Sequence, residues 1–142
     1  KTQYALRAVF ELACHYGEGP QKIAEIAKVQ AIPPRFLEVI LHQLKQGGFV
    51  DSRRGNEGGY FLVQDPKSLT VGEILNFLQG PMRPVDCMDT PEKCQLSGNC
   101  AFIALWERVE KAVNDIYDNT TFSDLVAEDK LRRENYVASY TI

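Results

Sequence analysis

Apolar residues recur at helical spacing over three stretches in the first third of the chain. These stretches cover residues 2–16, 21–29 and 33–46. Such spacing places the apolar side chains on one face of a helix, so it predicts three amphipathic helices. The Pro-Pro pair at 33–34 interrupts the second helix and can start the third, and Gly47 follows the third as a stop. Two helices joined by a short turn, the second with polar residues in its first turn, are typical of a helix-turn-helix.

A β-hairpin is expected after the third helix. Residues 49–53 and 60–63 have the composition of two short strands, and the segment 54–59 between them contains three glycines and an asparagine. Glycine and asparagine suit the backbone angles of tight turns, and glycine allows close approach to another surface. A hairpin directly after a helix-turn-helix is a wing. The predicted fold class is therefore mainly α, a winged helix-turn-helix with a small β-hairpin wing.

A long loop interrupts the second half of the chain. Thr70 and Glu73 form a capping-box pattern that opens a helix, and a Gly-Pro pair at 80–81 ends it. Residues 81–99 then hold three prolines and no apolar periodicity. A loop of this length inside a compact domain is usually functional, so it becomes the first place to look for chemistry.

A long helix with a continuous apolar stripe is expected over 101–118. A small domain cannot readily cover so wide an apolar face, so the stripe predicts a partner subunit. Beyond it we expect a short helix over 121–126, and the charged segment 128–142 has no assigned structure. The dimer contacts expected on the stripe are Phe102, Leu105, Trp106, Val109, Val113 and Ile116.

The net charge of −3 over 142 residues argues mildly against a nucleic-acid-binding protein. The two parts of the chain differ, however. Residues 1–60 contain eight Lys and Arg and six Asp and Glu, a net charge of +2, whereas residues 61–142 contain eight and thirteen, a net charge of −5. The helix-turn-helix and the wing can therefore still present a basic face to DNA.

Other classes of protein find little support. The apolar runs are far shorter than the ~18 residues that a membrane-spanning helix needs, and the first residues lack the layout of a signal peptide. No Ser/His/Asp set, phosphate-binding loop or pair of carboxylates points to catalysis. We expect a cytoplasmic protein without membrane partner or enzymatic activity and, because the sequence does not begin with Met, residues upstream of Lys1.

Three cysteines lie in and just after the long loop. Cys87, Cys94 and Cys100 are spaced C-x6-C-x5-C. Structural disulfides are disfavoured because the chain is neither cysteine-dense nor signal-bearing. Structural zinc sites usually contain C-x2-4-C pairs, which are absent here. Thiolates five or six residues apart can instead surround an iron–sulfur cluster, which the spacing favours over zinc.

Three ligands leave a fourth open. A residue of the partner subunit, or one upstream of Lys1, could supply it, as could several residues of this chain. Cys14 is more simply explained as a small buried apolar residue, and His42 as a solvated side chain. A metal-free alternative also stays open, in which two of the cysteines exchange between thiol and disulfide. The candidates for the fourth ligand in this chain are Asp86, Asp89, Cys14, His15 and His42.

The residues expected to read DNA lie early in the third helix and in the wing. Arg35 can bond guanine, and Glu38 can accept a hydrogen bond from the amino group of cytosine. Phe36 is either a DNA contact or a core residue. Arg53 and Arg54 precede the wing tip, where a cation can enter the minor groove, although a solvated charge pair is the simpler alternative. The full set expected at DNA is Arg35, Phe36, Glu38, Val39, Arg53, Arg54, Gly55, Gly58, Gly59 and Tyr60.

The sequence resembles the Rrf-two family of winged-helix transcription regulators, in particular its cluster-bearing IscR and NsrR types. The resemblance covers residues 3–126. It rests on YALRA at 4–8, the recognition helix at 32–44, RRGNEGGY at 53–60, SLTVGE at 68–73, the three cysteines, and the Leu-Trp pair at 105–106.

This resemblance implies a homodimer built on the long helix, with each recognition helix in a major groove of a double-stranded DNA operator. It also implies a [2Fe-2S] or [4Fe-4S] cluster on the three cysteines, whose state alters DNA affinity. Residues 1–66 would form the DNA-binding domain. Residues 67–127 would hold the sensor loop (81–100) and the dimerisation helix (101–118), and 128–142 a tail of unknown structure.

The chain departs from both cluster-bearing types at the fourth ligand. Ile103 stands where IscR-type proteins place a histidine, and Gln3 stands where NsrR-type proteins use an acidic residue. In the recognition helix, Pro34, Arg35 and Phe36 stand where the family has its variable polar contacts, so the operator should differ from that of IscR.

Overall fold

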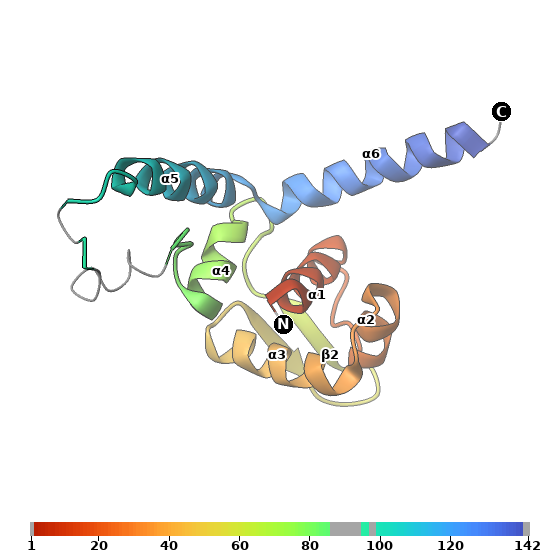
Figure 1. Ribbon diagram of the computed structural model, residues 1–142. Helices are drawn as coiled ribbons and strands as arrows, with labels where there is room; N and C mark the ends of the chain where they lie inside the picture. The colour runs from red at the N-terminus through yellow and green to blue at the C-terminus, as the bar shows by residue number, and fades with distance from the viewer. Residues whose placement is uncertain (1, 86–94, 97–98, 141–142) are drawn as a thin grey trace.

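A computed structural model describes residues 2–85, 95–96 and 99–140. Within these residues the chain forms helices and one two-stranded antiparallel hairpin, which confirms the mainly helical winged-helix fold (Figure 1). No described helix is both long and apolar enough to cross a membrane. The elements are α1 (Thr2–Cys14), α2 (Ile23–Gln30), α3 (Pro34–Gln46), β1 (Val50–Arg53), β2 (Gly59–Leu62), α4 (Val71–Gln79), α5 (Ile103–Asn119) and α6 (Phe122–Tyr140).

The helices α1, α2 and α3 pack together around one hydrophobic core, and α4 packs beside α1. The turn before α3 depends on Ala31, whose φ of 52° and ψ of 49° are left-handed. Pro34 then occupies the first turn of α3, where its missing N–H loses no helical hydrogen bond. Ala31 therefore caps the end of α2, and the Pro-Pro pair starts α3, as the sequence predicts.

The hairpin is held in register by alternating contacts with the core. Val50 pairs with Leu62, and both are buried, whereas Arg53 pairs with Gly59 next to the turn. An isolated bridge adds Gln21 beside Tyr60, with N–H···O distances of 2.8 and 2.9 Å between their main chains. The wing is therefore tied, close to its tip, to the segment that enters α2.

The hydrophobic core continues beyond residue 66. Leu69, Ile74 and Phe122 are fully buried in the same cluster as the core of α1 and α3. The main-chain N–H of Phe122 donates to the carbonyl oxygen of Leu69 at 3.0 Å, and that of Val71 donates to Thr120 at 2.9 Å. The winged helix, α4 and the start of α6 thus share one core.

The last helix is longer than expected. In place of a short helix over 121–126 and an unassigned tail, α6 continues from Phe122 to Tyr140. Its first turn is capped by Thr121, whose hydroxyl accepts from the main chain of Asp124 at 3.0 Å. No glycine or proline follows to stop it, and Asp129 pairs with arginines three and four residues later. Charge patterning rather than apolar periodicity marks this helix.

Other boundaries shift by a few residues. α1 ends at Cys14 rather than at residue 16, and α5 runs from Ile103 to Asn119 rather than over 101–118. Figure 1 shows α5 and α6 leading away from their junction in opposite directions, with α6 extending past the body of the winged helix.

Candidate nucleic-acid interface

The recognition helix α3 has two sharply different faces. Leu37, Ile40, Leu41 and Leu44 are fully buried in the core, and this fixes the rotation of the helix. The opposite face is exposed over its first two turns. This face carries Arg35, Phe36, Glu38, Val39 and His42, so it is available to the edges of bases in a major groove.

Phe36 is a surface residue rather than a core residue. Its side chain is 48% exposed, and its ring stacks on Tyr4 of α1 with centroids 6.3 Å apart and planes 22° apart. The guanidinium of Arg35 lies 5.5 Å from the centroid of the Phe36 ring, and that of Arg7 lies 5.0 Å from the centroid of Tyr4. Two aromatic rings with a cation at each end therefore flank the reading face of α3.

The main chain at the tip of the wing turns so tightly that it requires glycine. The main-chain N–H of Gly58 donates to the carbonyl oxygen of Gly55 at 3.0 Å. A Cβ on Gly58 would collide with the main chain of Arg53, and Gly55 has a φ of +107°. The glycines expected at DNA thus shape the tip that would approach it.

The two wing arginines have different surroundings. The guanidinium of Arg53 lies 5.2 Å from the centroid of the Phe61 ring, so it packs along the hairpin. Arg54 is exposed at the start of the tip. Arg54 is therefore the better placed of the two for a minor groove.

Strand β1 of the wing also contacts α3. The Nζ atom of Lys45 donates to the hydroxyl of Ser52 at 2.7 Å and lies 3.8 Å from a carboxylate oxygen of Asp51. Gly59 has no room for a side chain, because a Cβ there would collide with the main chain of Gln21. The wing is consequently in contact both with the recognition helix and with the segment before α2.

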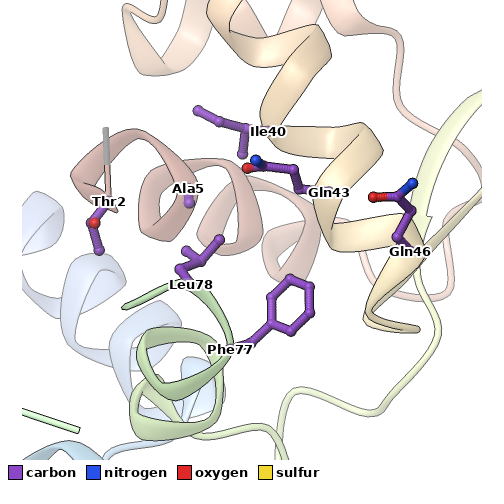
Figure 2. A pocket seen from close by; sticks show the side chains of 7 residues that line it. All are labelled: Thr2, Ala5, Ile40, Gln43, Gln46, Phe77 and Leu78. Carbon is purple, nitrogen blue, oxygen red and sulfur yellow. The ribbon is translucent and has the colours of Figure 1, made fainter. Parts of the chain in front are cut away.

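Helix α4 touches the end of α3 through one aromatic side chain. Phe77 packs edge to face on Phe49 at 5.2 Å between centroids, and its ring lies directly over Gly47. Figure 2 shows this ring beside a pocket of about 310 Å³ between α1, α3 and α4, into which the amide of Gln43 also points. Phe77 is therefore a contact between the end of the recognition helix and α4, the helix that precedes the cysteines in the sequence.

Only one of the three predicted cluster cysteines lies in the described part of the chain. Cys100 is a free, half-buried thiol just before α5. Cys87 and Cys94 lie outside the described residues, as do Asp86 and Asp89. Among the residues that are described, no three His, Cys, Asp or Glu side chains are grouped to hold a metal ion.

Two candidates for the fourth ligand are otherwise engaged. His15 lies between Glu11 and Glu18, with its Nε2 and Nδ1 atoms 3.0 and 3.3 Å from their carboxylates. Burial, with the nearby charge of Glu11, raises the pKa of the Cys14 thiol to about 11, so it stays protonated at neutral pH. Figure 1 places α1 beside α6, away from the start of α5. His42 lies on the exposed face of α3, as expected of a solvated side chain.

The predicted dimer stripe is uncovered in the single chain. None of the residues of α5 is buried, and Phe102, Leu105 and Ile116 are 59%, 43% and 65% exposed. Trp106, Val109 and Val113 are half-buried. The stacked rings of Phe102 and Trp106, 6.1 Å apart, begin an apolar surface along the helix.

A polar network behind the recognition helix was not anticipated from the sequence. Glu11 of α1 is only 8% exposed, and it accepts from Gln30 at the end of α2 at 2.9 Å as well as bonding His15. This network fixes α1 against the turn that precedes α3. The spacing of Glu11 and His15, four residues apart on one helix, was the available signal.

Comparison with known proteins agrees with this geometry. The family model Rrf2, described as an iron-dependent transcriptional regulator, matches residues 1–128. CymR of Bacillus subtilis is 34% identical over 137 residues, which cover 96% of this chain and 94% of that protein. IscR of Sodalis glossinidius is 30% identical over 131 residues, covering 92% and 79%. Both are named as helix-turn-helix transcriptional regulators.

Solved structures give the same result. The structure of B. subtilis CymR, described as the global cysteine regulator, matches with a TM-score of 0.77 and 35% identity over 89% of this chain and 93% of that one. T. potens IscR matches with a TM-score of 0.71 and 30% identity, covering 90% and 84%. The relatives are regulators and not enzymes, as the sequence predicts. The chain therefore belongs to the Rrf2 family of DNA-binding transcriptional regulators.

Proposed function

We propose that this regulator acts in the cytoplasm as a homodimer on a double-stranded DNA operator, and that an iron–sulfur cluster on Cys87, Cys94 and Cys100 modulates its binding. The exposed face of α3 carries the DNA-binding part of the proposal. Its apolar side is wholly buried, which leaves Arg35, Glu38 and their neighbours with no role in the core. Residues in such a position are available for base contacts.

The cluster part rests on the cysteines and on the relatives. The spacing C-x6-C-x5-C suits a cluster better than zinc. The Rrf2 model is described as iron-dependent, and IscR relatives match across most of the chain. Cys100 fits the ligand role because it is a free thiol at the edge of the structure rather than a core residue. When bound, an iron–sulfur cluster supplies one-electron redox chemistry and links its cysteine ligands through iron.

The chain offers two routes from the cysteines to the recognition helix. Cys100 stands just before α5, which carries the proposed dimer stripe, so the sensor segment can influence the spacing of the two subunits. On its other side the segment joins α4, whose Phe77 packs at the end of α3. Either route can change operator affinity only if the cluster favours one arrangement of the recognition helices over another, and only by the difference in its affinity for the two arrangements.

Metal analysis of anaerobically purified protein tests the cluster. We expect iron and acid-labile sulfide together with visible charge-transfer absorption, and we expect Cys100→Ser to lose all three. Cys14→Ser is the matched control, because Cys14 is a free thiol outside the three-cysteine set, and it should keep them. A colourless parent protein that contains zinc in place of iron contradicts the proposal.

A second candidate is a metal-free regulator that responds through thiols. The similarity to CymR favours it, since one CymR relative is a global cysteine regulator and the CymR of Staphylococcus aureus has a solved oxidized form. Thiol titration with and without oxidant separates the two. Three thiols protected until iron is removed indicate the cluster, whereas a reversible pair in iron-free protein indicates thiol exchange.

A further inference from the structure

A surface hollow of about 430 Å³ lies on the α1 side of the reading face. It is lined by Tyr4, Phe36, Val39 and Ile40, and its lining is mainly apolar. Val39 belongs both to this hollow and to the outward row of α3, because Arg35 and His42 stand four residues before and three residues after it on the helix. The hollow is therefore continuous with the surface that faces DNA.

An apolar hollow is unusual on a surface that is proposed to bind DNA. Val39 is 51% exposed and Phe36 is 48% exposed, although the remaining base-reading positions of the helix are polar. Leaving two such side chains in water is unfavourable unless a ligand covers them. In the major groove the apolar feature of a base pair is the C5-methyl group of thymine.

We propose that this hollow reads a thymine methyl group in each half of the operator. The walls are Val39 and Phe36, and the stack of Phe36 on Tyr4 holds the aromatic wall in place. The guanidinium of Arg7 lies over the ring of Tyr4 and that of Arg35 lies over the ring of Phe36, so positive charge flanks an apolar centre. This arrangement complements a base methyl group bordered by DNA phosphates and by acceptor atoms of neighbouring bases.

The inference rests on the proposed function, and its test separates the two. A library of random-sequence duplexes is selected for binding to the full chain. The enriched duplex is then remade with deoxyuridine in place of one thymine at a time, which removes only the C5-methyl group. Fluorescence anisotropy should show about a fourfold loss of affinity at one thymine in each half-site, the factor that corresponds to burying one methyl-sized group.

Two protein variants locate the effect in the hollow. Val39→Ala should bind the thymine and deoxyuridine duplexes alike, and Phe36→Ala should reduce the difference in the same way. Val63 is a matched control, because it is similarly exposed, at 54%, and follows the wing rather than lining the hollow. Val63→Ala should keep the full loss on deoxyuridine.

The outcomes distinguish the two levels of the proposal. If the library yields no enriched sequence, both DNA reading and methyl reading are overturned. If a sequence is enriched but no single deoxyuridine weakens binding, or if Val39→Ala keeps the full loss, the hollow does not read thymine while the regulator function stands.

Discussion

The helices α3 and α5 are both amphipathic, but the single chain buries the apolar face of only one of them. Leu37, Leu41 and Leu44 of α3 are completely enclosed by α1, α2 and the hairpin. Ile116 of α5 and Phe102, the residue before it, stay more than half exposed. The apolar face of α3 is thus closed within one chain, whereas the apolar stripe on α5 stays open to solvent.

This difference indicates a division of roles. A helix whose apolar face is closed can hold Arg35 and Glu38 at fixed positions for base recognition. A helix whose apolar face is open can change its packing when its neighbours change, and the cysteine segment leads directly into α5. The proposed sensing segment is accordingly joined to α5, the helix whose apolar stripe is exposed in the single chain.

A charge on the apolar stripe of α5 should have the strongest effect. Leu105→Asp places a charge on the exposed stripe, so we expect the dimer to dissociate and the operator affinity to fall by about 10²–10⁴-fold through loss of two-site binding. Sedimentation velocity and anisotropy measure the two effects. Ala104→Asp adds the same charge on the opposite side of α5 and should leave both unchanged. A Leu105→Asp protein that remains dimeric would show that the stripe is not the subunit contact.

The next effect tests how tightly the winged helix is closed. Gly59→Ala should lower the free energy of unfolding by about 3 kcal/mol, because its φ is +152° and a Cβ would meet the main chain of Gln21. Gly55→Ala is the matched control, since its φ is also positive but the space around it is open. Its loss should be only about 1 kcal/mol in urea unfolding. Equal losses would mean that the bridge between Gln21 and the wing contributes nothing.

The smallest effect concerns the network behind α3. Burial lowers the pKa of His15, but its hydrogen bonds to Glu18 and Glu11 and their charges outweigh this and raise the pKa above its ordinary value. The stabilisation is therefore complete below about pH 6.5 and is lost as the pH rises through the higher folded-state pKa. Because the His15 side chain is 35% exposed, solvent screening limits the change to about 0.5 kcal/mol.

Urea unfolding of the parent and of His15→Gln, compared between pH 5.5 and 8.5, measures this effect. The stability difference between the two should shrink as the pH rises. A difference that grows with pH would reverse the assigned role of the two carboxylates.

Much of the winged helix could be predicted from the sequence, because its signals are local. The Pro-Pro pair, the capping box of Thr70 and Glu73, and the glycines of the wing each act within a few residues, and the structure shows both capping-box hydrogen bonds, at 2.9 and 3.2 Å. Helical periodicity predicts the buried residues Leu37, Ile40, Leu41 and Leu44 of α3, but it places Phe36 on the same stripe.

Contacts between distant segments could not be predicted in the same way. Phe36 looked equally suited to the core, and only the position of Tyr4 on α1 shows it at the surface. The extension of α6 to Tyr140 could not be predicted because this charged segment has no apolar stripe at helical spacing. The packing of Phe77 on Gly47 joins segments whose proximity no local pattern encodes.

The most direct test of cluster control over DNA binding is the affinity of the selected duplex for two preparations of the same chain. One preparation is isolated anaerobically with iron, and the other is stripped of iron. We predict Kd values that differ by about 5- to 150-fold, the usual range of coupling between two sites. The difference should disappear in Cys100→Ser and persist in Cys14→Ser. Equal Kd values for the two parent preparations, despite different iron contents, would contradict control of DNA binding by a cluster on the three cysteines.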